Sequence, residues 1–519
     1  WSSMSKFVRS SKFRYVQGRA ANKDDIYENV NPSPTSAPDS NFIAANSKFF
    51  AIPWKGGGGP FVVHPLSCKG KLNSVPAVFQ GHSAPIQDLS FSPFCDSIIA
   101  SASEDSTLRV WNFAEVLDSS SPLKEDADEK CSVQLQGHSK KVMLARWNPV
   151  ADGILLSSSF DNTIRIWDAN KASEFRSVEL VDSPQHIAWN YDGSLFACTC
   201  KDKLLRICDP RTGAVAQEVA SQGGSKGAHV CFLGDKNMLA TVGFSPQSDR
   251  QIILRDSRDI TKTLVSQSID HDFGMLFPFF DPDTNILYLA GKGDCNIRYY
   301  EIVPTEPYIH FLDEFSAKDP QRGVCCLPKT VVDMANTEIN RFLRFCEKYV
   351  EPVSFSVPRK ADQSNDDLYP PTFAGKPSLS GDEWIKGSNA SPAMVDMLTG
   401  QVAEEVKSSA SNNPTPAAPA VEAELHKGRQ HKESRQSGEV QLKEVDPAVK
   451  PKERQAETPQ ETLLPVETSF DVLHTLNGIE LKGKLTVTVN TNDRLKEMEK
   501  RIKELELENA DLRAKLNAK

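Results

Sequence analysis

Short runs of alternating apolar and polar residues fill the first 345 residues, and the runs recur in the same order. The clearest unit starts with Gly-His and continues with three alternating runs, at residues 81–82, 89–93, 98–105 and 108–111. The next unit has the same parts, at residues 137–138, 145–149, 155–161 and 164–168. Alternation with a period of two predicts half-buried β-strands. The repetition therefore predicts an all-β repeat architecture.

Weaker copies of the pattern follow and precede the two clear units. Three further units lie at residues 188–209, 229–256 and 276–301. Upstream, strands are predicted at residues 42–45, 49–52 and 61–63; downstream, residues 308–326 begin a last unit whose first strand is 309–312. The count is seven. A ring of sheets that does not close leaves strand edges open, so we expect residues 12–16 to supply the last strand of the final unit.

These units resemble WD repeats, which have four short antiparallel strands, Gly-His near the start and Trp-Asp at the end. The resemblance implies a buried hydrogen-bonded chain of His, Ser, Asp and Trp in each clear unit. Its members here are His82, Ser101, Asp105 and Trp111, and then His138, Ser157, Asp161 and Trp167. A buried carboxylate without partners is costly, so the four residue types are needed together. We do not interpret them as a catalytic triad, because the same set recurs in successive units, as a scaffold does.

Several stretches outside the clear repeats resemble the coronin family of WD-repeat proteins. They are residues 9–14, 282–284, 291–302, 307–312, 320–323, 357–360 and 366–372, together with Trp384. The match runs from about residue 5 to residue 390, and its motifs are specific to the family. The resemblance implies a seven-bladed WD40 β-propeller that binds the sides of actin filaments. It also implies an extension that follows the ring and runs back along the propeller surface.

Composition changes along the chain and predicts further segments. We predict the propeller over residues 1–345 and the extension over residues 346–395, where prolines forbid a long helix and apolar residues can anchor the chain in a groove. These anchors are Phe355, Leu368, Tyr369, Phe373 and Trp384. Residues 396–467 are poor in aromatic residues and are predicted to be a disordered linker. Residues 468–490 alternate like a strand, and the sequence assigns them no function.

The last segment, residues 491–519, predicts an α-helical coiled coil. Apolar residues and one Asn recur at alternating steps of three and four, as in a heptad seam, at Leu495, Met498, Ile502, Leu505, Asn509, Leu512 and Leu516. Arg501, Ile502, Leu505 and Glu506 resemble a trimer signature of short coiled coils, whereas Asn509 at an a position favours a dimer. We favour a trimer and leave a dimer or an antiparallel tetramer open. The alternative is a lone amphipathic helix that docks on the propeller.

Charge and motifs exclude several functional classes. The net charge of −9 argues against a nucleic-acid-binding protein with a basic surface throughout. The 11 cysteines include no C-x-x-C pair, so no zinc site is expected. Phosphate-loop, zinc-protease and nucleophile-elbow motifs are missing, and we expect no enzyme activity, no metal and no cofactor. No apolar run is long enough to span a membrane and no signal-peptide core is found, so we expect a cytoplasmic protein.

The candidate filament contact is a basic strip in the amino-terminal segment. It consists of Lys6, Arg9, Lys12, Arg14, Arg19 and Lys23. An acidic filament would attract such a strip; the alternative is a set of solvated charges around the closing strand. Animal coronins carry a basic residue after a Tyr-Glu-x-hydrophobic stretch. In this chain, residues 27–30 match that stretch and Asn31 follows it.

The expected function is therefore that of an actin-filament-binding protein of the actin cytoskeleton and cell cortex. Oligomerised propellers would bind, crosslink or bundle filamentous actin (F-actin) and regulate actin dynamics. The family resemblance further implies binding of the actin-nucleating complex through the coiled-coil region. The alternative is a non-actin WD-repeat scaffold, such as a ubiquitin-ligase substrate adaptor or a trafficking adaptor. An adaptor-recruiting domain outside the ring would distinguish it, and the sequence contains no such domain.

Overall fold

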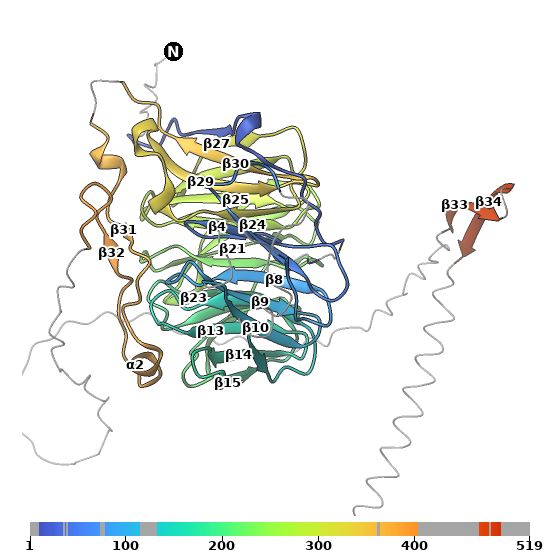
Figure 1. The fold of residues 1–519 in the computed structure, drawn as a ribbon, viewed down its shortest axis with the longest axis horizontal. Helices are drawn as coiled ribbons and strands as arrows, with labels where there is room; N and C mark the ends of the chain where they lie inside the picture. The colour runs from blue at the N-terminus through green and yellow to red at the C-terminus, as the bar shows by residue number, and fades with distance from the viewer. Residues whose placement is uncertain are drawn as a thin grey trace, which may run out of the picture. The chain divides into compact units, whose positions relative to one another are not determined.

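The computed structural model describes residues 10–34, 37, 40–72, 78–114, 132–360, 364–402, 467–476 and 479–488. The chain divides into two units, residues 1–412 and residues 413–519. In the described part of the first unit, seven sheets form the blades of a β-propeller, and a carboxy-terminal extension lies along one face of the ring (Figure 1). The predicted seven-bladed all-β propeller is confirmed.

The first six blades are four-stranded antiparallel sheets. Blade 1 contains β3 (Ala44–Ala45), β4 (Phe49–Pro53), β5 (Phe61–Pro65) and β7 (Val78–Phe79). Blade 2 contains β8 (Ile86–Phe91), β9 (Ile98–Ser103), β10 (Thr107–Asn112) and β11 (Ser132–Gln136). Blade 3 contains β12 (Val142–Trp147), β13 (Ile154–Ser159), β14 (Thr163–Asp168) and β15 (Ser173–Glu179). Blade 4 contains β16 (Pro184–Trp189), β17 (Phe196–Cys200), β18 (Leu204–Cys208) and β19 (Val215–Ala220). Blade 5 contains β20 (His229–Phe232), β21 (Met238–Phe244), β22 (Arg250–Asp256) and β23 (Asp259–Asp270). Blade 6 contains β24 (Leu276–Asp281), β25 (Ile286–Gly291), β26 (Asn296–Ile302) and β27 (Ile309–Ser316).

The seventh blade joins the two ends of the ring. It contains β28 (Gly323–Cys326), β29 (Glu338–Phe345) and β30 (Tyr349–Ser356), and it is completed by β1 (Gln17–Ala20), β2 (Tyr27–Glu28) and β6 (Gly70–Lys71). Both β1 and β2 pair antiparallel with β30, while β6 pairs parallel with β2. The short 3₁₀ helix η1 (Lys23–Asp25) lies between β1 and β2, and η2 (Lys329–Val331) and η3 (Met334–Asn336) lie between β28 and β29.

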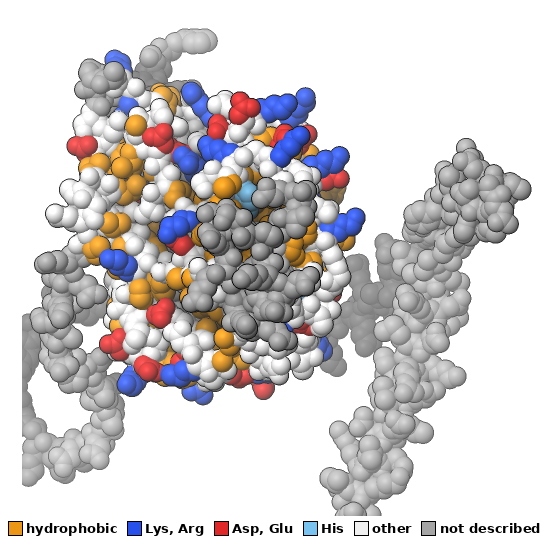
Figure 2. Space-filling view, in the orientation of Figure 1, with side chains coloured by type: hydrophobic (Ala, Val, Ile, Leu, Met, Phe, Trp, Pro, Cys, Tyr) orange, Lys and Arg blue, Asp and Glu red, His pale blue; other side chains and the backbone are white. Residues whose placement is uncertain are grey.

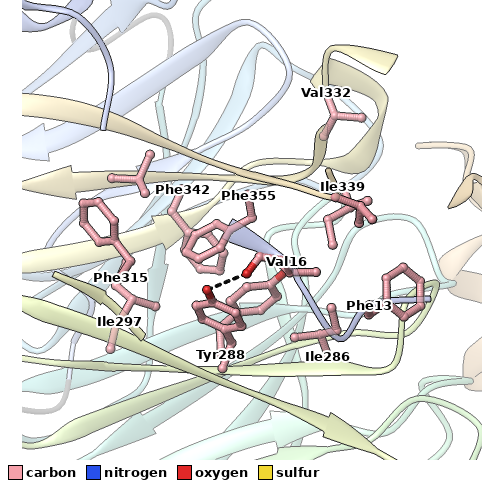
Figure 3. Close-up of a cluster of buried hydrophobic side chains, with 14 of the residues drawn as sticks. Phe13, Val16, Ile286, Tyr288, Ile297, Phe315, Val332, Ile339, Phe342 and Phe355 are labelled. Carbon is pink, nitrogen blue, oxygen red and sulfur yellow. Dashed lines mark hydrogen bonds between the residues drawn. The ribbon is translucent and has the colours of Figure 1, made fainter. Parts of the chain in front are cut away.

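The amino-terminal segment closes the ring, but the closing strand is β1 and not residues 12–16. Residues 12–15 form a turn instead, and the side chains of Phe13 and Val16 are buried between blades 6 and 7 (Figure 3). The apolar pattern of residues 12–16 therefore reports burial and not strand pairing. The adjacent strand passes so close to the core that a Cβ atom on Gly18 would lie 2.7 Å from the Cβ of Phe315.

Two other sequence predictions are wrong. Residues 309–312 begin β27, which is the outer strand of blade 6 and pairs with β26. They do not start the last unit, because a tight turn after β26 folds the chain straight back on that strand; β28 starts blade 7. The predicted propeller boundary at residue 345 separates β29 from β30, so the ring extends to Ser356. Of the predicted extension anchors, Phe355 therefore lies inside a blade.

The extension crosses the ring from blade 7 to blades 3 and 4, in orange in Figure 1. It contains η4 (Asp366–Leu368), β31 (Thr372–Phe373), α2 (Gly381–Ile385) and β32 (Met394–Val395). Tyr369 is buried and its hydroxyl donates to the Glu338 carbonyl at 3.0 Å. Trp384 is buried at the far end, where its indole N–H donates to the Gly193 carbonyl at 2.8 Å. These aromatic anchors fix the extension to the propeller at both ends.

The structure brings together the four residues of each predicted WD hydrogen-bonded chain. In blade 2, the Trp111 indole donates to Ser101 Oγ at 2.9 Å, Ser101 Oγ lies 2.7 Å from His82 Nε2, and His82 Nδ1 lies 2.8 Å from Asp105. The equivalent three distances in blade 3 are 2.8, 2.8 and 2.9 Å. Both imidazole nitrogens of each histidine are engaged in the core, so neither ring can serve as a general base for a substrate.

The second unit contributes one antiparallel hairpin, β33 (Glu467–Leu476) and β34 (Ile479–Thr488), within the segment that the sequence showed as alternating. Residues 396–402 of the predicted linker still belong to the extension, where Val395 and Val402 form an isolated β-bridge. The remaining linker residues up to 466 and the coiled-coil segment from Leu495 to Leu516 lie outside the described residues. No helix among the described residues is long and apolar enough to cross a membrane.

The buried carboxylate of blade 3 gives a test of the WD chain. Burial raises the pKa of Asp161, but hydrogen bonds from Thr163, Ser139 and His138 outweigh it and lower the pKa to about 2. A carboxyl whose pKa falls on folding stabilises the protein above its unfolded pKa, and this stabilisation is lost between about pH 4 and pH 2. We expect Asp161→Asn to lower the free energy of unfolding at pH 7 by about 2 kcal/mol, with the difference from wild type shrinking over that acid range.

Urea unfolding of both proteins from pH 7 to pH 2 measures this difference. The matched control is Asp235→Asn, since the Asp235 side chain is 73% exposed and should contribute little at any pH. A penalty for Asp161→Asn that is no larger than that of the control at pH 7 would contradict the role given to the carboxylate.

Candidate interaction surface

The two faces of the propeller differ. The extension contacts turns between first and second strands, at Val150 and Gly193. Because the strands of a blade alternate in direction, the turns between second and third strands lie on the opposite face. We name the covered face the extension face and the other the open face. The amino-terminal segment runs along the outer edge of blade 7 between them, with Gln17 opposite Ser356 and Glu28 opposite Tyr349.

The predicted basic strip does not form one patch. Lys6 and Arg9 lie outside the described residues. The Lys12 amine donates to the Asp367 carbonyl of the extension, so it is engaged on that side. The other three cations are exposed, but they lie one after another along the edge of blade 7 and do not cluster: Arg14, Arg19 and Lys23. The strip is thus spread along the whole edge of blade 7.

Arg14 borders a hollow between the amino-terminal turn and β27. Its guanidinium carbon lies 5.6 Å from the centre of the Tyr15 ring. The hollow has a volume of about 500 Å³, and its wall includes Phe311, which is 55% exposed, as well as Tyr15, which is 69% exposed. This part of the edge therefore combines one cation with exposed aromatic surface.

A second group of cations lies on the open face, between blades 7 and 1. Lys55 is in the turn between β4 and β5, Lys71 is in β6, Arg322 precedes β28, and Lys348 is in the turn between β29 and β30. We call these four residues the interblade basic cluster. They line a cavity of about 800 Å³, whose acidic lining residues are Glu28 and Glu347. Four cations against two carboxylates leave an excess of positive charge.

The four cations have different roles. Arg322 is partly buried: its guanidinium lies 5.3 Å from the Phe42 ring and donates to the Ser33 carbonyl at 3.1 Å. Burial lowers the pKa of Arg322, and its contacts fix the loop that follows β2. Lys55, Lys71 and Lys348 are exposed, and within the described residues none of their amines has an ion-pair partner. These three lysines are therefore available to an external partner.

Asn31, which stands where animal coronins carry a basic residue, lines the same cavity. Its carbonyl accepts the backbone N–H of Lys55 at 3.0 Å, which holds the loop against the first blade. Lysines from other segments thus surround the position whose own side chain is neutral. In Figure 2, Lys and Arg side chains gather at the upper right of the propeller, where Figure 1 shows the blue amino-terminal segment beside β30.

Comparison with known proteins gives matches over the same regions. Models of a WD domain (G-beta repeat) match residues 73–112 and 129–168, a type of WD40 repeat matches residues 350–392, and a domain of unknown function, DUF1899, matches residues 6–71. The last range includes the predicted basic strip, Asn31, Lys55 and Lys71.

Full-length relatives extend these matches. Coronin-A of Dictyostelium discoideum is 43% identical over 404 residues, which cover 77% of this chain and 88% of that protein. The coronin-like protein crn1 of Schizosaccharomyces pombe is 36% identical over 451 residues, or 86% of this chain and 73% of crn1. Human coronin-2A is 38% identical over 401 residues, or 76% and 75%.

A solved structure shares the fold. The crystal structure of the WD40 domain from Toxoplasma gondii coronin has a TM-score of 0.69 and 35% identity, and the match covers 74% of this chain and 97% of that domain. The sequence identity, its extent and the shared propeller show that this chain belongs to the coronin family.

Proposed function

We propose that this chain is a non-enzymatic actin-filament-binding protein of the cytoplasmic cell cortex, and that the interblade basic cluster contacts the filament. The observation that carries the proposal is the presence of three exposed, unpaired lysines around Asn31. Actin filaments are acidic, so a surface with excess positive charge attracts them, and the attraction weakens with salt. Lys55, Lys71 and Lys348 supply the charge that Asn31 lacks.

The contact extends along the edge of blade 7. Lys23 in η1 and Arg19 in β1 lie between the interblade basic cluster and the hollow beside Arg14. Both are exposed, so they continue the basic surface towards the extension face. Lys12 contributes less, because its amine is already bound to the carbonyl of Asp367.

Oligomerisation makes such a contact effective. Single surface ion pairs contribute about 0–1 kcal/mol each, so one propeller binds weakly. The predicted heptad seam from Leu495 to Leu516 would join several propellers through long tethers, and once one is bound the others gain effective concentration. The same arrangement would crosslink or bundle filaments and regulate actin dynamics. By family resemblance, the coiled-coil region also binds the actin-nucleating complex.

Reversing the charge of the three free lysines tests the contact. We expect the variant with Lys55, Lys71 and Lys348 changed to Glu to bind filamentous actin about tenfold more weakly or worse in a cosedimentation assay at low salt, because repulsion replaces attraction. The matched control changes three exposed lysines elsewhere, Lys262, Lys376 and Lys386, to Glu. Equal binding by the two variants would show that the filament contact lies elsewhere.

Removing the coiled coil tests the role of oligomerisation. A chain ending at residue 490 should pellet with filaments in high-speed centrifugation about tenfold more weakly than the full chain, because the avidity of joined propellers is lost. It should also lose much of its ability to form bundles that sediment at low speed. If the full chain does not pellet even at low salt, the chain is a scaffold or adaptor with no filament affinity.

A further inference from the structure

A cavity lies at the centre of the extension face. First strands of most neighbouring blades contact one another around the middle of the ring, and the segments that follow these strands in blades 2 to 7 form much of the cavity wall. The extension adds Thr372 and Phe373 of β31 and Met394 of β32. The volume is about 620 Å³, within the range of small-molecule sites. Partly exposed aromatic side chains of the wall include Trp147, Trp189, Phe232, Phe279, Phe280 and Phe373.

The charged groups of this aromatic wall do not balance. Its two cations, Arg146 and Lys329, each contact a carboxylate, in the pairs Arg146–Asp88 and Lys329–Asp281. Asp283 also lines the cavity, and no cation of the described residues lies within ion-pair distance of it. One negative charge is therefore left over.

The surroundings of Asp283 disfavour a bare negative charge. Burial and the neighbouring carboxylate of Asp281 raise the pKa of Asp283 to about 6, and the Thr372 hydroxyl and the charge of Lys329 offset only part of this rise. The Lys329 amine itself is bound to Asp281. At about pH 7.5, Asp283 is thus ionised inside a mainly apolar cavity, where an added cation would stabilise its charged form.

Nothing else in the wall supplies that cation. Burial lowers the pKa of His186, which also lines the cavity, well below its usual range, so this histidine is neutral. An anionic ligand would be repelled by Asp283, and a neutral apolar ligand would leave its charge without a partner. The charge and the aromatic surface together therefore favour a ligand that is both cationic and apolar.

We propose that this cavity binds a small organic cation of the quaternary ammonium class, with the cationic group beside Asp283 and its methyl groups against the aromatic side chains. Aromatic rings attract such cations through the negative charge of their faces, and the attraction grows where water is excluded. A quaternary ammonium ion donates no N–H hydrogen bond, so an aromatic wall with one carboxylate meets its requirements.

The site is separate from the proposed filament contact. The cavity opens on the extension face, whereas the interblade basic cluster lies on the open face, and the two cavities share no lining residue. Their chemistry is also opposite, because one would attract a cation and the other an acidic partner. The proposal goes beyond filament binding and does not depend on it.

Titration calorimetry of the full chain with benzyltrimethylammonium at about pH 7.5 tests the role of the carboxylate. We expect wild type to bind this probe and Asp283→Asn to bind it about tenfold more weakly, because the substitution removes the charge and keeps the shape. The matched control is Asp235→Asn, whose carboxylate is 73% exposed and does not line the cavity, and it should bind like wild type.

A second pair of variants tests the location. Phe373→Ala removes an aromatic ring from the wall and should weaken binding of the same probe several-fold. Phe311→Ala is the control, since Phe311 is 55% exposed on the outer strand of blade 6 and does not line this cavity. It should leave binding unchanged.

A pair of ligands tests the preference for charge on the wild-type chain, without any substitution. Choline should bind more tightly than its neutral carbon analogue, in which a tert-butyl group replaces the trimethylammonium group. Three results would each overturn the proposal: no binding of benzyltrimethylammonium to wild type, equal binding by Asp283→Asn and Asp235→Asn, or equal binding of choline and its neutral analogue. Filament cosedimentation of Asp283→Asn should match wild type, and it reports on the filament contact separately.

Discussion

The pairing of β1 with β30 is the constraint on which the rest of the molecule depends. A ring of sheets is stable only when its first and last members join, because an open ring exposes two unpaired strand edges. The buried side chains of Phe13 and Val16 and the hydrogen bond from the Tyr299 hydroxyl to the Val16 carbonyl, 2.9 Å long, hold this junction together (Figure 3). Closure also makes blades 7 and 1 neighbours, and the interblade basic cluster exists only because of it.

Sequence alone predicts the repeated units of this fold well. It predicts poorly the segments and contacts that depart from the repeat. The WD chain of His82 and His138 could be found because the same residues recur at the same spacing. In blade 5, buried Arg250 instead binds Asp270 of the same blade and Asp294 of blade 6. The errors at residues 12–16 and 309–312 share one limit: an apolar pattern does not say which strand a segment pairs with. Ring closure decides this for the amino-terminal segment, and the turn after β26 decides it for residues 309–312.

The candidate interaction surface was the hardest part to predict. Each lysine of the interblade basic cluster is an isolated charge in a turn or a short strand, with nothing in its local sequence to distinguish it from an ordinary solvated residue. Lys55 and Lys348 are far apart in the chain, and only the contact between the first and last blades brings them to one cavity. The sequence pointed to Asn31 through family resemblance, and so it located the region but not the residues that supply its charge.

The weakness of single surface ion pairs links the proposed filament contact to the predicted oligomerisation. In the proposed contact, three solvated lysines would give an attraction that salt screens. Under the proposed function, tight binding would then depend on joining several propellers and not on a better single site. In the proposed arrangement, the filament contact lies on the propeller and the predicted heptad seam lies near the end of the chain, so a change in one would leave the closed ring undisturbed.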